Sequence, residues 1–403
     1  MSRTVLRGGR VLDGTGAATA DGDVVIEDGR IVEVGLGLDG DEEVDVTGRT
    51  ILPGFIDCHV HVVFSGVDPF RMQHEPFSYQ FYAAARNLAA TVDTGVTTVR
   101  DAGGADAGIK KALSDGLIEG PRLRTAVTVL GQTGGHTDGW SASGETVRLL
   151  VPHPGRPDMI VDGPDEMRRR VRELVRAGAD VIKICTSGGV LSPSDDPRHG
   201  HFSPEEIDVC VAEAAAAGLG VMAHAQGTAG IKNAVRAGVV SIEHGVHLDD
   251  EAISLMLERG TWLVPTLIAG RALLRDVDAG TTRLPAAVLD KARAVTAEHL
   301  ESIRRAVDAG VPIALGTDSG VFPHGSNLDE LELLGEAGLS PVDALRAGTS
   351  SAARLLGLGD ELGSVEPGKV ADLVVLDGDP LDLTGYGKRV AQVWQRGHLV
   401  RTR

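Results

Sequence analysis

Histidine and aspartate residues stand at the ends of several apolar, strand-like stretches of the sequence. The first stretch, ILPGFIDCHVH, contains His59 and His61, two positions apart. On a strand this spacing places both imidazoles on the same side, where two histidines can bind one cation. Later stretches end in the same way, VMAHAQG at His224, SIEHG at His244 and ALGTDSG at Asp318. Each residue alone is compatible with a structural role, but together these five indicate one shared site.

A lysine lies inside another apolar stretch, DVIKICTSGG. The chain has seven lysines, and Lys183 is the one within such a strand-like segment. An unpaired buried ammonium is unfavourable by several kcal/mol, so this residue needs a partner, a shifted pKa or a covalent modification. Two interpretations remain open. Lys183 either reaches a carboxylate, or it reacts with CO₂ to form a carbamate, an anionic oxygen ligand that can bridge two metal ions.

Strand-like and helix-like segments alternate through the middle of the chain. We count eight such units, with helices predicted for PDEMRRRVRELVRAGA, SPEEIDVCVAEAAAAG and AEHLESIRRAVDAG. This alternation predicts an α/β fold with a parallel sheet, closed as a (β/α)₈ TIM-type barrel, in which catalytic groups stand at the carboxyl ends of the strands. An open doubly wound sheet is the alternative, but no G-x-G-x-x-G follows the first strand.

The two ends of the chain consist of short strand-like segments broken by Gly, Asp-Gly or Pro. We therefore predict two domains. Residues 1–53 plus 363–403 form a small β-sandwich domain built from both termini, and residues 54–362 form the barrel.

Charge and cysteine content narrow the class of protein. The 403 residues carry 39 Lys+Arg against 57 Asp+Glu, a formal net charge of −18. Such an acidic surface repels nucleic-acid backbones and anionic lipid, so we expect no nucleic-acid or membrane partner. The three cysteines are far apart without a CxxC pair, which argues against a thiolate zinc site and fits a reducing compartment. A cytoplasmic enzyme acting on a small molecule is the expectation.

Taken together, the motifs resemble the amidohydrolase superfamily over nearly the whole chain. They are HVH after ILPGFID, the Lys of VIKI, HAQG, EHG, GTDSG and the closing segment SVEPGKVADLVVLDGDP. The resemblance is to the branch of metal-dependent dipeptidases, prolidase-like and Xaa-Arg dipeptidase-like, and imidazolonepropionase-related enzymes. It implies a homo-oligomer. It also implies a binuclear centre of two divalent ions, for which Zn²⁺ is expected and Co²⁺, Mn²⁺ or Fe²⁺ are alternatives. The implied ligands are His59, His61, carboxylated Lys183, His224, His244 and Asp318.

The resemblance further implies hydrolysis of an amide bond, in a dipeptide or an N-acyl amino acid. A hydroxide shared by the two cations would attack the carbonyl, with Asp318 as general base and then general acid. His136, in LGQTGGHTDGW, would approach the substrate and stabilise its oxyanion; the alternative is a loop histidine bonded to Asp138. Gln226 stands where many relatives carry a tyrosine that can bind the substrate carboxylate, so we assign Gln226 to substrate binding and leave the dipeptide preference open.

A cyclic-amide hydrolase or a deaminase of the imidazolonepropionase type is the alternative, but deaminases of the superfamily usually use one metal and lack the strand lysine. A catalytically inactive scaffold would lack ligands, and none is missing.

Arg100 and Asp101 are predicted to form an ion pair at a strand end. The loop 186–203, rich in turn-forming residues, is predicted to be a lid or a collar around the substrate.

Overall fold

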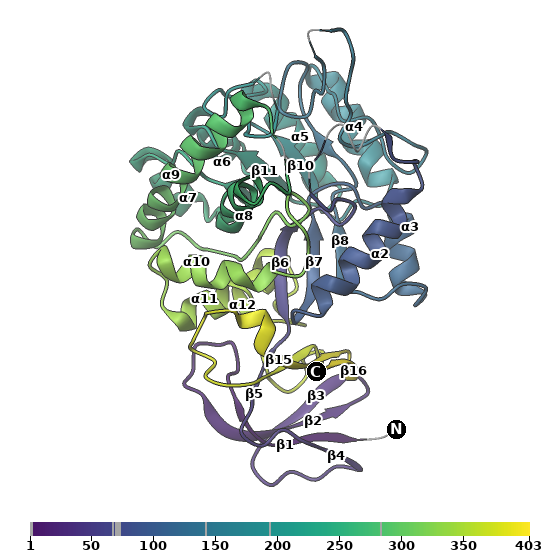
Figure 1. Ribbon diagram of the computed structural model, residues 1–403, viewed down its shortest axis with the longest axis vertical. Coiled ribbons are helices and arrows are strands. Elements are labelled where there is room, and N and C mark those ends of the chain that lie inside the picture. Colours follow the sequence, from purple (N-terminus) through teal and green to yellow (C-terminus); the bar gives the residue numbers. More distant parts are fainter. Residues whose placement is uncertain (1–2, 67, 69–73, 142, 193–194, 283) are drawn as a thin grey trace.

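The computed structural model describes residues 3–66, 68, 74–141, 143–192, 195–282 and 284–403. Strands from both ends of the chain and parallel strands from its middle form separate sheets (Figure 1). The terminal strands are β1 (Thr4–Val11), β2 (Ala20–Glu27), β3 (Arg30–Gly35), β4 (Glu42–Asp45), β5 (Thr50–Pro53), β14 (Leu373–Leu376), β15 (Val390–Gln395) and β16 (His398–Thr402).

The terminal strands form one eight-stranded sheet in the order β16-β15-β14-β5-β1-β2-β3, with β4 paired to β1. The two ends of the chain join where β14 runs antiparallel to β5, with Val374 opposite Leu52. Apolar side chains such as Leu6, Ile51 and Trp394 form the core of this sheet. Both termini therefore contribute to a single sheet, whereas its two-layered sandwich form and the domain limits 1–53 plus 363–403 and 54–362 stay predictions.

The middle of the chain alternates strands and helices. The strands are β6 (Phe55–Val60), β7 (Val96–Asp101), β8 (Arg122–Thr125), β9 (Val129–Leu130), β10 (Ile182–Cys185), β11 (Val221–Ala225), β12 (Ser241–His244) and β13 (Trp262–Val264). The helices are α2 (Tyr79–Val92), α3 (Ala107–Ser114), α4 (Pro164–Arg176), α5 (Pro204–Ala216), α6 (Thr228–Ala237), α7 (Asp250–Arg259), α8 (Leu267–Asp278), α9 (Ala286–Asp308), α10 (Glu330–Glu336), α11 (Pro341–Ala347) and α12 (Ser350–Leu355). An α/β fold is thereby confirmed.

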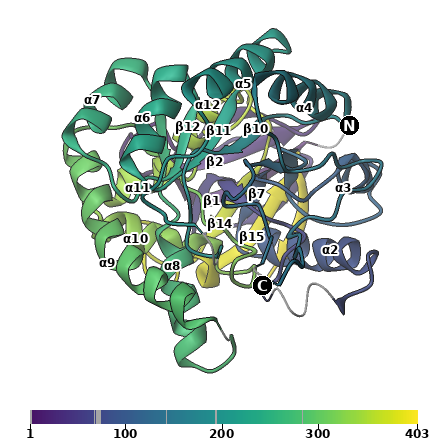
Figure 2. The same cartoon turned by 90° about the horizontal axis from the view of Figure 1, so that it is seen from above.

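All strand pairs in the middle of the chain are parallel. They form a three-stranded sheet, β6-β7-β8, and a five-stranded sheet, β13-β12-β11-β10-β9. Isolated parallel bridges join Leu263 to Ile313 and Val60 to Ser319, so the segment 313–319 runs between β13 and β6. Seen from above, the helices lie around these strands (Figure 2). Closure of the two sheets into an eight-stranded barrel stays a prediction.

Local sequence explains where the predicted helices begin. Helix α5 starts after Ser203, whose side chain accepts from the amide of Glu206 while Glu206 reaches back to the amide of Ser203, a capping box. Helix α4 starts with Pro164 in its first turn. Backbone amides of the first turn make no hydrogen bond within the helix, so a proline, which lacks the N–H, is tolerated there. Its residues Met167 and Val171 are buried four positions apart, as expected for a helix with one apolar face.

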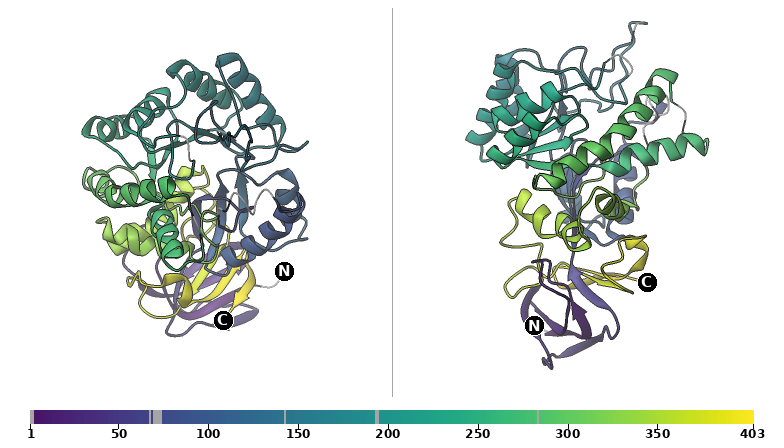
Figure 3. Two further views of the ribbon diagram at one scale, coloured as in Figure 1. Left: turned by 45° about the horizontal axis from the view of Figure 1, so that its top comes forward. Right: turned by 90° about the vertical axis from the view of Figure 1, so that its left-hand side faces the viewer.

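The terminal sheet lies at one end of the molecule, below the strand-and-helix region in both views of Figure 3. Among the described residues, no helix has the length and apolar composition that crossing a membrane requires. His224 and His244 stand at the carboxyl ends of β11 and β12, and because these neighbouring strands are parallel, the two residues lie at the same edge of the five-stranded sheet.

Candidate active site

Strand β6 and the segment after it place two histidines against Asp318. The Nε2 atoms of His59 and His61 each lie 3.4 Å from Oδ1 of Asp318. The backbone amide of Asp318 donates to the carbonyl of His59 at 2.7 Å, which fixes the aspartate beside the strand. Burial alone would raise the pKa of Asp318, but the charges and hydrogen bonds of His59 and His61 hold it well below its usual value.

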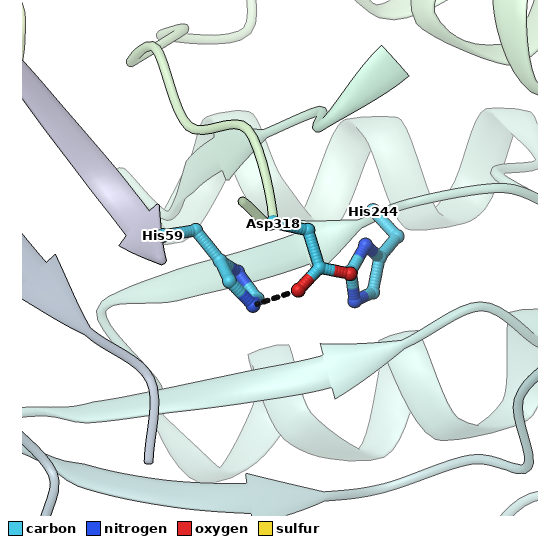
Figure 4. A group of neighbouring side chains, drawn as sticks. All are labelled: His59, His244 and Asp318. Carbon is cyan, nitrogen blue, oxygen red and sulfur yellow. Dashed lines mark ion pairs between the residues drawn. The ribbon is translucent and has the colours of Figure 1, made fainter. Parts of the chain in front are cut away.

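Ligand atoms of His59, His244 and Asp318 lie within 4.8 Å of one another. Figure 4 shows the three side chains converging, His59 from β6 and His244 from β12. His244 and Asp318 both have left-handed backbone conformations, with φ of 74° and 60°. Such conformations are unfavourable for residues other than glycine and are often found at functional sites.

The Nδ1 atoms of three of these histidines are engaged by neighbouring groups. Nδ1 of His59 donates to Glu243 Oε2 at 2.7 Å, and Nδ1 of His61 donates to the carbonyl of Gly103 at 2.8 Å. Nδ1 of His244 lies 2.7 Å from Oγ1 of Thr266. A hydrogen bond at Nδ1 fixes the orientation of the ring and leaves Nε2 as the atom that can bind a cation.

Glu243 is a site residue that the sequence reasoning missed. Its side chain is fully buried, where it pairs with Nη2 of Arg100 at 3.0 Å and accepts from His59. Burial would raise the pKa of Glu243, but Arg100 and His59 lower it to about 2, so the carboxylate is anionic. An acidic residue inside the apolar stretch SIEHG was the available signal, of the same kind as Lys183 in its strand.

The predicted ion pair between Arg100 and Asp101 is wrong. Arg100 points to Glu243, and its Nε donates to the carbonyl of Cys58 at 2.6 Å. Asp101 instead accepts from the backbone amides of Val62, at 2.8 Å, and of two residues in its own turn. Successive side chains of a strand point to opposite faces, which separates these two neighbours.

Lys183 is buried in β10, with 2% of its surface exposed. Its Nζ has no hydrogen-bond partner among the described residues, and burial lowers the pKa of its amine. A pairing with a surface carboxylate is therefore not the arrangement found. The lysine lines the same cavity as His59, His244 and Asp318.

His224, at the end of β11, lies between two other histidines. Its ring stacks on that of His136 with centroids 4.4 Å apart, and its centroid is 4.7 Å from that of His244. The Nε2 of His224 donates to the carbonyl of Gly188 at 3.1 Å, so Nδ1 is the nitrogen left for a ligand. Burial holds the pKa of His224 well below its usual value, which favours the neutral imidazole that can bind a cation.

His136 does not bond Asp138, which was the alternative to an active-site role. Nδ1 of His136 lies 2.8 Å from Oγ of Ser192 and 3.5 Å from Oδ2 of Asp195, both in the loop 186–203. Asp138 accepts from the backbone amides of Gly134 and Trp140 instead. Positions 193 and 194 of this loop lie outside the described residues.

One cavity of about 270 Å³ is lined by all eight residues predicted for the site. They are His59, His61, His136, Lys183, His224, Gln226, His244 and Asp318. Gln226 is buried, and its Oε1 has no hydrogen-bond partner among the described residues. The remaining wall is mainly apolar, with Leu149, Leu150, Met159, Val190, Leu191, Leu273 and Val295 among its residues.

The donor set fits a site for divalent metal. It consists of imidazole nitrogens, a carboxylate and a buried amine with an unsatisfied nitrogen, without a paired thiolate. Nitrogen and oxygen donors of this kind suit Zn²⁺ and related ions, whereas the lone buried amine needs a modification before it can serve as an anionic ligand.

Comparison with known proteins identifies the family. Residues 50–400 match the Amidohydrolase family, so the chain belongs to this family and is a hydrolase acting on C–N bonds. The chain is similar to the crystal structure of a prolidase complexed with N-methylphosphonate-L-proline, at 37% identity, a TM-score of 0.91 and 100% of each chain covered.

Two curated relatives extend this comparison. The chain is 34% identical over 420 residues to an ochratoxinase of Aspergillus niger, covering 98% of this chain and 86% of that protein. It is 29% identical over 420 residues to an imidazolonepropionase of Rhizorhabdus wittichii, covering 93% of this chain and 94% of that protein. Hydrolysis of amide bonds is the activity that these relatives support.

Proposed function

We propose that the protein is a binuclear metal-dependent amidohydrolase that cleaves the amide bond of a dipeptide or an N-acyl amino acid. The observation that carries this proposal is the unpartnered Nζ of Lys183, buried in a cavity together with four strand-end histidines and Asp318. A buried lysine without a partner is costly unless a ligand or modification satisfies it. The parallel bridges through residues 313 and 319 support a closed barrel as the scaffold.

The ligands proposed for the two ions are His59, His61, Lys183, His224, His244 and Asp318. Lys183 reacts through its neutral amine with CO₂, forming an N–C bond and releasing one proton, and the resulting carbamate provides two anionic oxygens. When bound, two divalent ions polarise the substrate carbonyl and lower the pKa of water to about 7.

Proton transfer in this proposal is the work of Asp318. Its carboxylate accepts the proton of the attacking water and returns it to the nitrogen of the departing amine. The backbone bond from its amide to the carbonyl of His59 keeps the side chain beside the two histidines while it does so. Its depressed pKa means that the carboxylate is in the proton-accepting form.

His136 and Gln226 are proposed to bind the substrate. His136 reaches the cavity beside His224, where its imidazolium form can donate a hydrogen bond to the oxygen that becomes negative during attack. The unpartnered Oε1 of Gln226 can accept a hydrogen bond from a substrate N–H. The apolar walls favour a substrate with a large apolar group on one side of the amide.

A cyclic-amide hydrolase or deaminase is the second candidate, because the imidazolonepropionase relative aligns with 93% of the chain. Lys183 favours the binuclear amide hydrolase over this candidate. The cytoplasmic location and the homo-oligomeric state stay predictions.

Elemental analysis and a substrate screen test the proposal. Purified protein is expected to hold about two divalent ions per chain, and chelation is expected to abolish release of amine from dipeptides and N-acyl amino acids. Fully active protein with one ion per chain, or turnover of cyclic amides alone, would transfer the assignment to the second candidate.

A further inference from the structure

One side chain of α9, Lys291, ties the segment after β10 to the rest of the site. Its Nζ donates to the carbonyls of Gly189 and Asp195, at 3.0 Å each, and to that of Ser192. The same nitrogen lies 3.4 Å from Oδ1 of Asp195. An ammonium group has three protons to donate, and the backbone carbonyls with the carboxylate satisfy all of them. Lys291 thus fixes three positions that flank His136.

Asp195 extends this contact to the imidazole. Its side chain is 2% exposed, and its Oδ2 lies 3.5 Å from Nδ1 of His136. Ser192 donates its hydroxyl to Oδ1 of Asp195 and lies 2.8 Å from the same Nδ1. Burial would raise the pKa of Asp195, but His136, Ser192 and Lys291 hold it below its usual range, so the group is a carboxylate. With Nδ1 engaged, Nε2 is the nitrogen of His136 that remains for the cavity.

Gly189 contacts the imidazole through its backbone. A Cβ atom at this position would lie 2.2 to 2.7 Å from three atoms of the His136 ring, closer than any side chain tolerates. Gly189 does not have a positive φ, so the backbone conformation itself is open to alanine. The glycine is therefore needed for the space that the ring of His136 occupies, and the ring also stacks on His224.

We propose that Lys291 and Asp195 are positioning residues that hold His136 with Nε2 directed into the cavity. The inference rests on the proposed function in one respect, that His136 contacts the substrate. Lys291 acts from α9, whose Ala292, Val295 and His299 also line the cavity, so one helix both shapes the pocket and orients the imidazole. Neither residue touches the substrate in this arrangement.

A double-mutant cycle tests the inference. Lys291→Met and Asp195→Asn are expected to lower kcat by about 10- to 100-fold, with KM changing by less than about threefold and metal content unchanged. In a His136→Gln background, Lys291→Met is expected to add less than about a twofold loss, because the group it positions is already gone. Gly189→Ala is expected to lower kcat as His136→Gln does, since the added methyl displaces the ring.

Lys110→Met is the matched control, because Lys110, on α3, pairs with the largely buried Asp180 and neither residue lines the cavity. Its kcat is expected to equal that of the wild type. Equal losses from Lys291→Met in the wild-type and His136→Gln backgrounds would show that Lys291 only stabilises the loop. Full activity of both Lys291→Met and Asp195→Asn would also overturn the inference.

A second readout does not depend on activity. Trypsin releases residues 125–148 as one peptide, in which His136 is the single histidine. The folded protein is first treated with diethyl pyrocarbonate and then digested, and mass spectrometry measures carbethoxylation of His136 in this peptide. The reaction is expected to be several-fold faster in Lys291→Met than in the wild type or Lys110→Met. An unchanged rate would refute the positioning role. If the rate rises while His136→Gln keeps full activity, the positioning stands and the substrate role of His136 fails.

Discussion

Nδ1 of His59 donates to Oε2 of Glu243 over 2.7 Å, although the two residues are 184 positions apart in the chain. Glu243 is also paired with Arg100, and all three side chains are buried. A carboxylate on the far nitrogen of a histidine fixes the ring and makes its other nitrogen a better ligand. Glu243 therefore links the buried Arg100 of β7 to His59, a residue of the candidate metal centre.

Glu243→Gln is expected to weaken metal binding by about 10- to 100-fold, because it keeps the shape but removes the charge opposite His59 and Arg100. Titration of the metal-free protein with Zn²⁺ measures this change. Glu251→Gln, which removes a carboxylate paired with Arg236 on the surface, is the control and is expected to bind metal normally. Equal affinity in both variants would contradict the role of Glu243.

Lys183→Ala is expected to lose most of the bound metal and activity, and short carboxylic acids are expected to restore part of both by occupying the space. In Lys183→Met, the metal-free protein should melt at a higher temperature than the wild type, because a buried unpartnered amine is replaced by an apolar group of similar length. Near-normal metal content and rate in Lys183→Ala would show that no carbamate is needed.

Asp318→Asn is expected to fold and to retain at least one metal ion, yet to lose kcat by about 100-fold or more, since an amide cannot accept the proton. Substrates with good leaving groups, such as aryl esters, should be affected less, because they depart without protonation. Comparing an amide and an ester with the same acyl group measures this difference. Equal losses for both would mean that another residue moves the proton.

Ala269→Leu is expected to reduce turnover of substrates with large apolar groups by about tenfold or more and to spare small ones. Ala269 lines the cavity from the first turn of α8, where added carbons fill the space for substrate. The ratio of kcat/KM for a large and a small N-acyl amino acid measures the effect. Ala297→Leu, on the exposed side of α9, should leave that ratio unchanged. A common loss for both substrates in Ala269→Leu would argue against this position as a size filter.

Glu330→Gln is expected to change how stability depends on pH. Burial raises the pKa of Glu330 to about 8, although the hydrogen bonds that it accepts from the backbone amides of Ile268 and Leu267 have the opposite, smaller effect. Between the unfolded value of 4.5 and about 8 the folded protein binds more protons at this group than the unfolded chain, so its contribution to stability falls as pH rises. The stability of the wild type relative to Glu330→Gln should thus decrease from pH 5 to pH 8 in denaturant titrations. A constant difference would refute the raised pKa.

The sequence predicts those parts of the site that depend on short spacing within one strand. His59, His61, His224, His244 and Asp318 follow apolar stretches, and parallel strands bring their ends to one edge. Their presence around one cavity follows from that geometry, while their roles as ligands stay predictions. The helices α4 and α5 were predicted from proline and acidic residues in their first turns, which act within a few residues.

Contacts between segments that are distant in the chain cannot be predicted from short sequence patterns. Nothing near Glu243 in the chain indicates His59, and nothing near Lys291 indicates Asp195, because each pair meets only after several strands and helices have packed. The error at Arg100 and Asp101 had another origin. Proximity in the sequence favours a pair between these neighbours, but alternation along the strand places their side chains on opposite faces.

The pairing of β14 with β5 has a consequence for biosynthesis. The sheet order places β14 and β15, from the last 31 residues of the chain, beside strands from the first 53. While the ribosome is still making the protein, β5 presents an unpaired edge, because its partner strand β14 follows the whole strand-and-helix region in the chain. The sheet is therefore complete only after β14 has been made and has paired with β5. Pairing between such distant segments slows folding, and until it occurs the edge of β5 is exposed to other chains. Loss of the final strands by a premature stop is expected to cause aggregation of the whole chain rather than loss of one small domain.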